Sequence, residues 1–219
     1  MRNFQRIFAA FLVLGAFACS EDDDSATDDT TAALGETDMS FFVTSSGSGA
    51  MGANLGGVGG ADERCEQLAA AVGAGAKTWR AYLSTTLQNA RDRIGDGPWY
   101  NAKGDMIAAD VASLHTNGLK NGNPQHMMDE QGNAVPGPEH DILTGSDTEG
   151  RVFMMDGAAH TCSDWSVNTG APGPRVGHAD IPTNPMFSPS WNNAHTPPGC
   201  DQMSLTMVGG AGRLYCFAE

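Results

Sequence analysis

Positive charge is scarce in this sequence. Its 219 residues include 12 Lys and Arg against 26 Asp and Glu, a formal net charge of −14 at pH 7. Proteins that bind nucleic acid neutralise phosphates with clustered Lys and Arg, and no such cluster occurs here. We therefore expect no nucleic-acid partner.

Aromatic residues (7%) and charged residues (17%) are also few, whereas Gly (28) and Pro (11) are abundant. This composition excludes a coiled coil and a collagen-like repeat, and no internal repeat is visible. We expect one compact, loop-rich globular domain.

The N-terminal apolar run, from Ile7 to Phe17, is shorter than the roughly 20 residues of a membrane span. It follows two arginines, which is typical of a secretory signal, so we predict a signal peptide over residues 1–18. The next residue, Cys19, ends a segment (A-F-A-C) that resembles the lipobox of bacterial lipoproteins. We expect Cys19 to be lipidated, and Ser20 then implies sorting to the outer membrane, facing the periplasm or the cell surface. The alternative is an ordinary cut after Ala18 that leaves a free thiol.

Residues 19–38 should form a disordered tether. Eight acidic residues and no basic one lie between Glu21 and Asp38, amid Ser, Thr and Ala, so the stretch has little apolar surface to bury. The folded domain is then residues 39–219, which keep a net charge of −8.

Four further cysteines remain: Cys65, Cys162, Cys200 and Cys216. An even number in an exported chain favours two disulfides, and three pairings are possible. No C-x-x-C occurs, so a zinc site built from the four thiolates is the weaker alternative.

Patterning predicts a set of local structures. Strands are expected at 40–44, 78–84, 99–100, 106–108, 151–155, 204–208 and 213–217. Helices are expected from about Gly60 to Val72, with Cys65 facing the core and Asp62 and Glu63 near its N-terminus, and from about Thr86 to Ile94. In 78–84, Trp79, Ala81 and Leu83 should face inwards and Arg80 and Tyr82 outwards. Turns are expected at 101–105 and 129–133, and loops at 47–60, over the rest of 106–140 and at 170–199.

The layout of the cysteines resembles the C-type lectin-like fold. One lies on the first helix, one lies near the end in L-Y-C-F, and the second of the middle pair follows W-N-N at 191–193. The chain is more closely similar to bacterial exported lectin-like or endostatin-like lipoproteins, a family described as a domain of unknown function, through residues 41–45, 54–57, 60–62, 90–95, 97–101, 140–146, 161–165, 190–193 and 214–217. The resemblance implies an α+β fold in which short helices pack on small mixed or antiparallel sheets with long loops. It also implies nested disulfides, Cys65 with Cys216 and Cys162 with Cys200.

The resemblance further implies a ligand-binding surface, for which the candidates are Asp164, Trp165, Trp191, Asn192 and Asn193. Sugar-binding C-type lectins hold Ca²⁺ with E-P-N or Q-P-D plus W-N-D, because this ion takes six to eight oxygens. Here Asn193 replaces the Asp, and neither tripeptide occurs, so we expect binding without calcium and assign no cofactor. Alternatively, Asn192 and Asn193 hold loop backbone by side-chain hydrogen bonds, and the tryptophans, with Trp99 and Tyr100, belong to the core. Endostatin binds heparin through clustered Arg, which this acidic chain lacks.

Catalytic and metal motifs are absent. The six histidines (His115, His126, His140, His160, His178 and His195) form no H-E-x-x-H or other short ligand spacing, so we assign no metal ligand, although any pair that meets in space could bind zinc. Asp141 and Thr144 in H-D-I-L-T-G-S are suited to fixing a turn. No G-x-S-x-G occurs, and we predict no catalytic residue.

We therefore expect a lipid-anchored, exported binding module rather than an enzyme. Its loops at 106–140 and 170–199 should recognise a neutral or basic surface glycan or protein, because the acidic charge steers such partners. The alternatives are a hydrolase-type enzyme on the same fold and a passive envelope protein. A convergent cluster of buried ionisable groups would favour the enzyme, and a shallow polar or aromatic-lined groove would favour binding.

Overall fold

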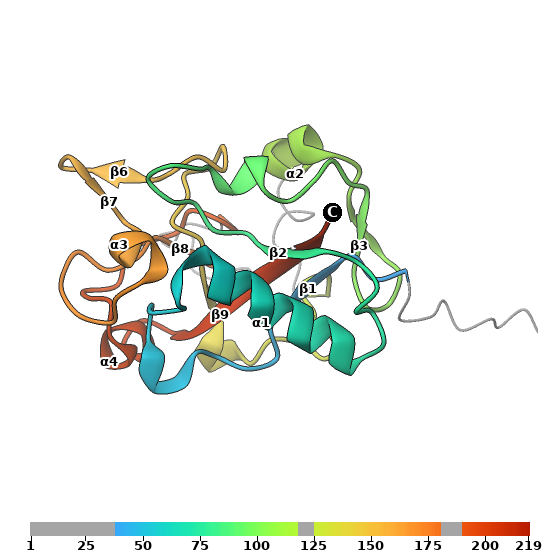
Figure 1. Cartoon of the computed structure of the whole chain (residues 1–219), viewed down its shortest axis with the longest axis horizontal. Coiled ribbons are helices and arrows are strands. Elements are labelled where there is room, and N and C mark those ends of the chain that lie inside the picture. The colour runs from blue at the N-terminus through green and yellow to red at the C-terminus, as the bar shows by residue number, and fades with distance from the viewer. Residues whose placement is uncertain (1–37, 118–124, 181–189) are drawn as a thin grey trace, which may run out of the picture. The chain divides into compact units, whose positions relative to one another are not determined.

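The computed structural model of the chain describes residues 38–117, 125–180 and 190–219 (Figure 1). The predicted signal peptide (1–18), Cys19 and the tether up to residue 37 lie outside the described residues. Within those residues, no helix is both long and apolar enough to cross a bilayer.

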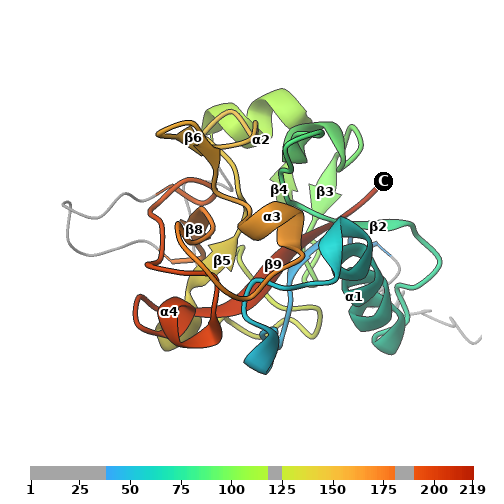
Figure 2. The same cartoon turned by 60° about the vertical axis from the view of Figure 1, so that its left-hand side comes forward.

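The domain is mixed α+β and is built around one long strand, β9 (Gly210–Ala218). Towards its C-terminal end, β9 pairs antiparallel with β1 (Phe41–Val43) and β2 (Trp79–Ala81). Towards its N-terminal end it pairs parallel with β5 (Asp141–Leu143), which in turn pairs antiparallel with β8 (Val176–His178). Figures 1 and 2 show β9 running through the middle of the domain with the other elements around it.

Short elements surround this sheet. The helices are α1 (Gly57–Ala71), α2 (Val111–Asn117), α3 (Cys162–Trp165) and α4 (Gln202–Thr206), with 3-10 turns η1 (Gly49–Met51), η2 (Ala90–Asp92) and η4 (Gly137–Glu139). Two small antiparallel pairs join β3 (Trp99–Tyr100) to β4 (Met106–Ala108) and β6 (Met154–Met155) to β7 (Ala158–Ala159).

The core lies on both faces of β9. Leu214 and Cys216 belong to a cluster that includes the buried side of α1, whereas Tyr215 and Phe217 belong to a second cluster on the other face. Successive side chains of a strand point to opposite faces, so both faces of β9 are buried by its neighbours. This explains why the segment lacks the alternation of polar and apolar residues typical of a half-exposed strand.

Both disulfides have the nested pairing that the resemblance implied. Cys65 on α1 joins Cys216 on β9, and Cys162 on α3 joins Cys200. Disulfides form and persist in oxidising compartments, so the pair is typical of an extracytoplasmic protein.

Several local predictions are confirmed. Strands occur within the expected 40–44 and 78–84 segments, β9 covers the expected 213–217 segment and extends beyond it at both ends, and β3 and β4 pair as expected across the 101–105 turn. In the 129–133 turn, the Asp129 carboxylate accepts hydrogen bonds from the backbone N–H groups of Gln131 and Asn133.

The first helix begins at Gly57, one turn earlier than predicted, so its acidic residues do not lie at its N-terminus. Asp62 instead forms a salt bridge to Arg93, with a nitrogen–oxygen distance of 2.7 Å, and accepts the Ala81 N–H. It therefore ties α1 to β2.

The predicted helix over 86–94 is wrong, because only the turn η2 forms there. Side-chain oxygens take up the backbone donors a helix would need: Thr85 Oγ1 accepts from the N–H groups of Leu87 and Gln88, and Asp164 accepts from Thr86. Such local bonds compete with helix formation.

The predicted strand over 204–208 is also wrong, because this segment lies in α4 and the turn after it. Asp201 caps the helix by accepting the Ser204 N–H, a signal that marks helix starts. Tyr82, expected to face outwards, is fully buried in the second cluster because that face of the sheet is covered too.

Three other segments also differ from prediction. The segment 106–140 contains α2, the segment 170–199 contains β8, and the predicted strand over 151–155 is reduced to Met154–Met155.

We expect the two disulfides to contribute unequally to stability. In the chain-entropy model, a crosslink across 151 residues contributes about 5 kcal/mol and one across 38 residues about 4 kcal/mol. Urea unfolding of the Cys65→Ala/Cys216→Ala and Cys162→Ala/Cys200→Ala variants should show the larger loss in the first. Equal losses, or a larger loss in the second, would contradict this account.

His115 should make the fold sensitive to mild acid. Burial lowers the pKa of His115, although its bond to the Val111 carbonyl opposes this, and its Nε2 lies 2.8 Å from the Tyr82 hydroxyl. Its neutral form is therefore favoured by folding, so this contribution is complete above the ordinary pKa of about 6.5 and is lost as pH falls below it. The stability advantage of the wild type over His115→Asn, measured by urea unfolding, should be smaller at about pH 5 than at about pH 7.5. An advantage that is constant or grows in acid would refute this.

Candidate functional site

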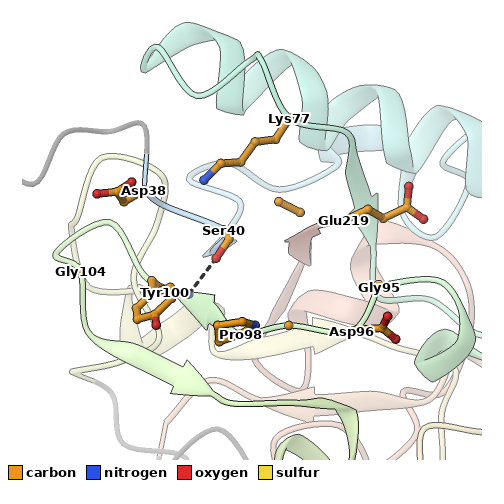
Figure 3. Close-up of a pocket in the computed structure, with 11 residues that line it drawn as sticks. Asp38, Ser40, Lys77, Gly95, Asp96, Pro98, Tyr100, Gly104 and Glu219 are labelled. Atoms are coloured by element: carbon orange, nitrogen blue, oxygen red, sulfur yellow. Dashed lines mark hydrogen bonds between the residues drawn. The ribbon is translucent and has the colours of Figure 1, made fainter.

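A cavity of about 810 Å³ lies near the C-terminal end of β9 (Figure 3). Its lining includes three carboxylates (Asp38, Asp96 and Glu219) and the half-buried ring of Tyr100. The one cation among the described lining residues, Lys77, donates to the Met39 carbonyl at 2.7 Å. This lining suits a neutral or basic ligand.

Apart from this cavity, three histidines and one aspartate lie close together at the start of β5. These are His140, Asp141, His178 and His195, which we call the His/Asp cluster. His140 follows η4, and Asp141 is the first residue of β5 and lies directly opposite His178 in the antiparallel β5–β8 ladder. His195 pairs with Val176, two residues before His178 on β8. Strand pairing thus joins residues that are up to 55 positions apart in the sequence.

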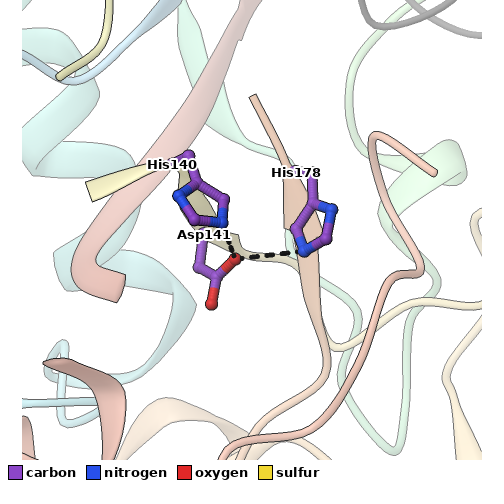
Figure 4. Close-up of side chains that lie close together, drawn as sticks. All are labelled: His140, Asp141 and His178. Carbon is purple, nitrogen blue, oxygen red and sulfur yellow. Dashed lines mark ion pairs between the residues drawn. The ribbon is translucent and has the colours of Figure 1, made fainter. Parts of the chain in front are cut away.

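The imidazole nitrogens converge on the Asp141 carboxylate. Nε2 of His140 and Nε2 of His178 each lie 3.3 Å from Oδ1, and Nε2 of His195 lies 3.1 Å from Oδ2. Figure 4 shows the rings of His140 and His178 on either side of the carboxylate, each with a nitrogen towards Oδ1. The ligand atoms of His140, Asp141 and His178 all lie within 4.8 Å of one another.

The Asp141 carboxylate is fully buried, and neither of its oxygens has a hydrogen-bond partner. A buried charge is costly unless it is paired and hydrogen-bonded or coordinates a metal. The register of β5 against β9 shifts between Asp141 and Ile142, and such irregularities redirect side chains at functional sites. The prediction that Asp141 fixes a turn is therefore wrong. Thr144 does fix its loop, because its hydroxyl donates to the Asn192 carbonyl at 2.7 Å.

Backbone contacts orient His140. Its Nδ1 lies 2.6 Å from the Gly137 carbonyl and donates to it. The lone pair of the ring is therefore on Nε2, the nitrogen beside Asp141. Gly209 also packs against the ring, and an added Cβ there would lie 2.6 Å from Cε1. Glu139, the residue before, is held by an ion pair with Arg213 of β9.

His178 has no hydrogen-bond partner on either ring nitrogen and is almost fully buried. Burial lowers its pKa below the ordinary value, although Asp141 opposes the shift. The neutral imidazole, which is the form that binds metals, is therefore the favoured one.

Two of the three spacings among these atoms match those around a bound transition metal. Zn²⁺ binds imidazole nitrogen and carboxylate oxygen at about 2.0–2.2 Å, so two donors on a tetrahedral ion lie about 3.3 Å apart. The two nitrogen–Oδ1 distances are 3.3 Å. Imidazole and carboxylate donors together suit zinc and its first-row neighbours.

Arg175 positions the segment that carries His195. Its guanidinium donates to the Asn193 side chain and, at 3.1 Å, to the Ala194 carbonyl, and it packs over the Phe153 ring at 4.2 Å. Since Arg175 directly precedes β8, it links the strand of His178 to the segment of His195.

The ligand-binding residues predicted from the sequence lie mainly in the interior. Trp165 and Trp191 are buried, as the alternative of a core role predicted, and Asn192, next to Trp191 in the sequence, is also buried. The Asn192 amide donates to the Asp147 carbonyl at 3.0 Å, so its predicted role in holding loop backbone is confirmed. Asn193 is bound by Arg175, and Asp164 is bound by the N–H and hydroxyl of Thr86.

The sequence contains one local sign of the His/Asp cluster, the adjacent pair His140-Asp141. The other two members, His178 and His195, carry no spacing signal, because they join the pair through strand pairing across separate segments.

No protein-family model matches the sequence, and no curated protein is significantly similar to it. The lectin-like family assignment therefore stays a prediction from the resemblance.

Proposed function

We propose that this protein is an extracytoplasmic metal-binding domain whose metal centre is formed by His140, Asp141 and His178, beside His195. The observation that carries the proposal is the buried Asp141 carboxylate, which has no hydrogen-bond partner and faces two imidazole nitrogens at 3.3 Å. A divalent cation offsets this charge and supplies the bonds that the three side chains lack. The ligand it binds is a first-row transition metal such as Zn²⁺.

The C-type lectin-like architecture is part of the same proposal. It is supported by the mixed α+β fold and by the nested disulfides Cys65–Cys216 and Cys162–Cys200. The predicted lipid anchor at Cys19 and outer-membrane location would place the metal centre outside the cytoplasm.

A second candidate function is the predicted recognition of a surface glycan or protein without calcium. The cavity in Figure 3 supports this role, because its carboxylates and Tyr100 suit a basic or neutral ligand. The His/Asp cluster, by contrast, is the kind of convergent buried group that favours the enzyme alternative.

Replacing Asp141 should have opposite effects on the metal-free and the metal-loaded protein. The Asp141→Asn variant removes a buried charge that accepts no hydrogen bond, so the metal-free full chain should unfold at a higher urea concentration than the wild type. The same change should weaken Zn²⁺ binding by about 100-fold or more, since even outer partners of metal ligands contribute 10–100-fold.

The measurements are calorimetric Zn²⁺ titration of the chelator-treated full chain and urea unfolding with and without Zn²⁺. The matched control is Asp96→Asn, which removes an exposed carboxylate from the cavity wall and should leave Zn²⁺ affinity unchanged. Wild-type protein that binds no Zn²⁺, or an Asp141→Asn variant that binds it as well as the wild type, would refute the metal centre.

Arg175→Lys should weaken Zn²⁺ binding without touching the ligands. Lysine keeps the positive charge but cannot donate to Asn193 and Ala194 from one planar group, so the His195 segment loosens. We expect roughly a tenfold loss of affinity, smaller than that of Asp141→Asn, in the same calorimetric titration. The exposed Arg151→Lys variant serves as the control. Wild-type affinity in Arg175→Lys would contradict the positioning role.

A further inference from the structure

The His/Asp cluster has a buried side and an exposed side. The Asp141 and His178 side chains are 0% and 4% exposed, whereas those of His140 and His195 are 25% and 33% exposed. A metal ion bound between these side chains therefore faces the protein interior on one side and solvent on the other.

His195 differs from the other two histidines in what it faces. His140 and His178 both lie against Oδ1 of Asp141, and these three residues form the compact set of ligand atoms. His195 lies outside that set and faces Oδ2 instead, at 3.1 Å. An ion bound by His140, Asp141 and His178 is therefore linked to His195 only through Oδ2 of the Asp141 carboxylate.

Three protein donors do not complete the coordination of a transition metal. Zinc sites with three protein ligands keep a further position for water or substrate, whereas closed structural sites use four. Two neutral imidazoles and one carboxylate leave a divalent ion with a net charge of about +1. The position that remains therefore favours an anionic donor.

We propose that the metal centre keeps an open coordination position on its solvent side, which takes up a small carboxylate from solution, and that His195 is a positioning residue that orients Asp141. This inference rests on the metal binding proposed above. The ligand is small because the chain's net charge of −14 opposes a polyanionic partner. His195 acts through Oδ2 and leaves the open position free.

The test uses the full chain loaded with Co²⁺, whose visible spectrum reports the number and kind of its ligands, with acetate as the probe. Titrating acetate into the wild type should change the spectrum saturably. The His195→Ala variant should bind Co²⁺ about tenfold more weakly, as expected for loss of an outer partner, and should still respond to acetate. His126→Ala, outside the His/Asp cluster, is the control for histidine loss and should behave as the wild type.

A wild-type spectrum that acetate leaves unchanged would overturn the open position. If acetate then changed the spectrum of His195→Ala, His195 would occupy that position as a fourth ligand. Such a result would leave metal binding intact, whereas failure of the wild type to bind Co²⁺ and Zn²⁺ would refute the proposed function itself.

Discussion

The structure depends on the burial of β9 on both of its faces. This strand pairs with three others, carries Cys216 of the longer disulfide and contributes side chains to both hydrophobic clusters. The His/Asp cluster also depends on this strand, because β5, which carries Asp141, pairs in parallel with β9 on one edge and with β8 on the other. Arg213 of β9 also binds Glu139, next to His140. Core packing and the geometry of the candidate site therefore have a common origin.

Asp141 shows how a site can oppose stability. A carboxylate without hydrogen bonds in a buried position destabilises the fold, and an apolar or amide side chain there would be tolerated better. The surrounding structure holds it nevertheless, through the β5 ladder on one side and Gly209 against His140 on the other. Such a conflict between local cost and global fold is typical of functional sites.

The sequence predicted the parts of the fold that depend on local chemistry. Gly and Asn turns, apolar strands and the helix around Cys65 follow from residue preferences, and the disulfide pairing followed from the family resemblance. The wrong predictions, at 86–94 and 204–208, arose where a side chain distant or adjacent in sequence took over backbone hydrogen bonds, as Asp164 and Asp201 do. The His/Asp cluster was missed for a related reason, since the register of β5 with β8 is a tertiary property that no spacing of His140, His178 and His195 reveals.

The position of β9 in chain order affects how the domain is assembled. It follows every other described element, yet it is the strand that joins β1 and β2 to β5 and β8 in one sheet. During synthesis from the N-terminus, the apolar faces of the earlier segments therefore stay exposed until Gly210–Ala218 has been made. Because these pairings join segments far apart in the sequence, the central sheet is expected to form slowly and late in folding.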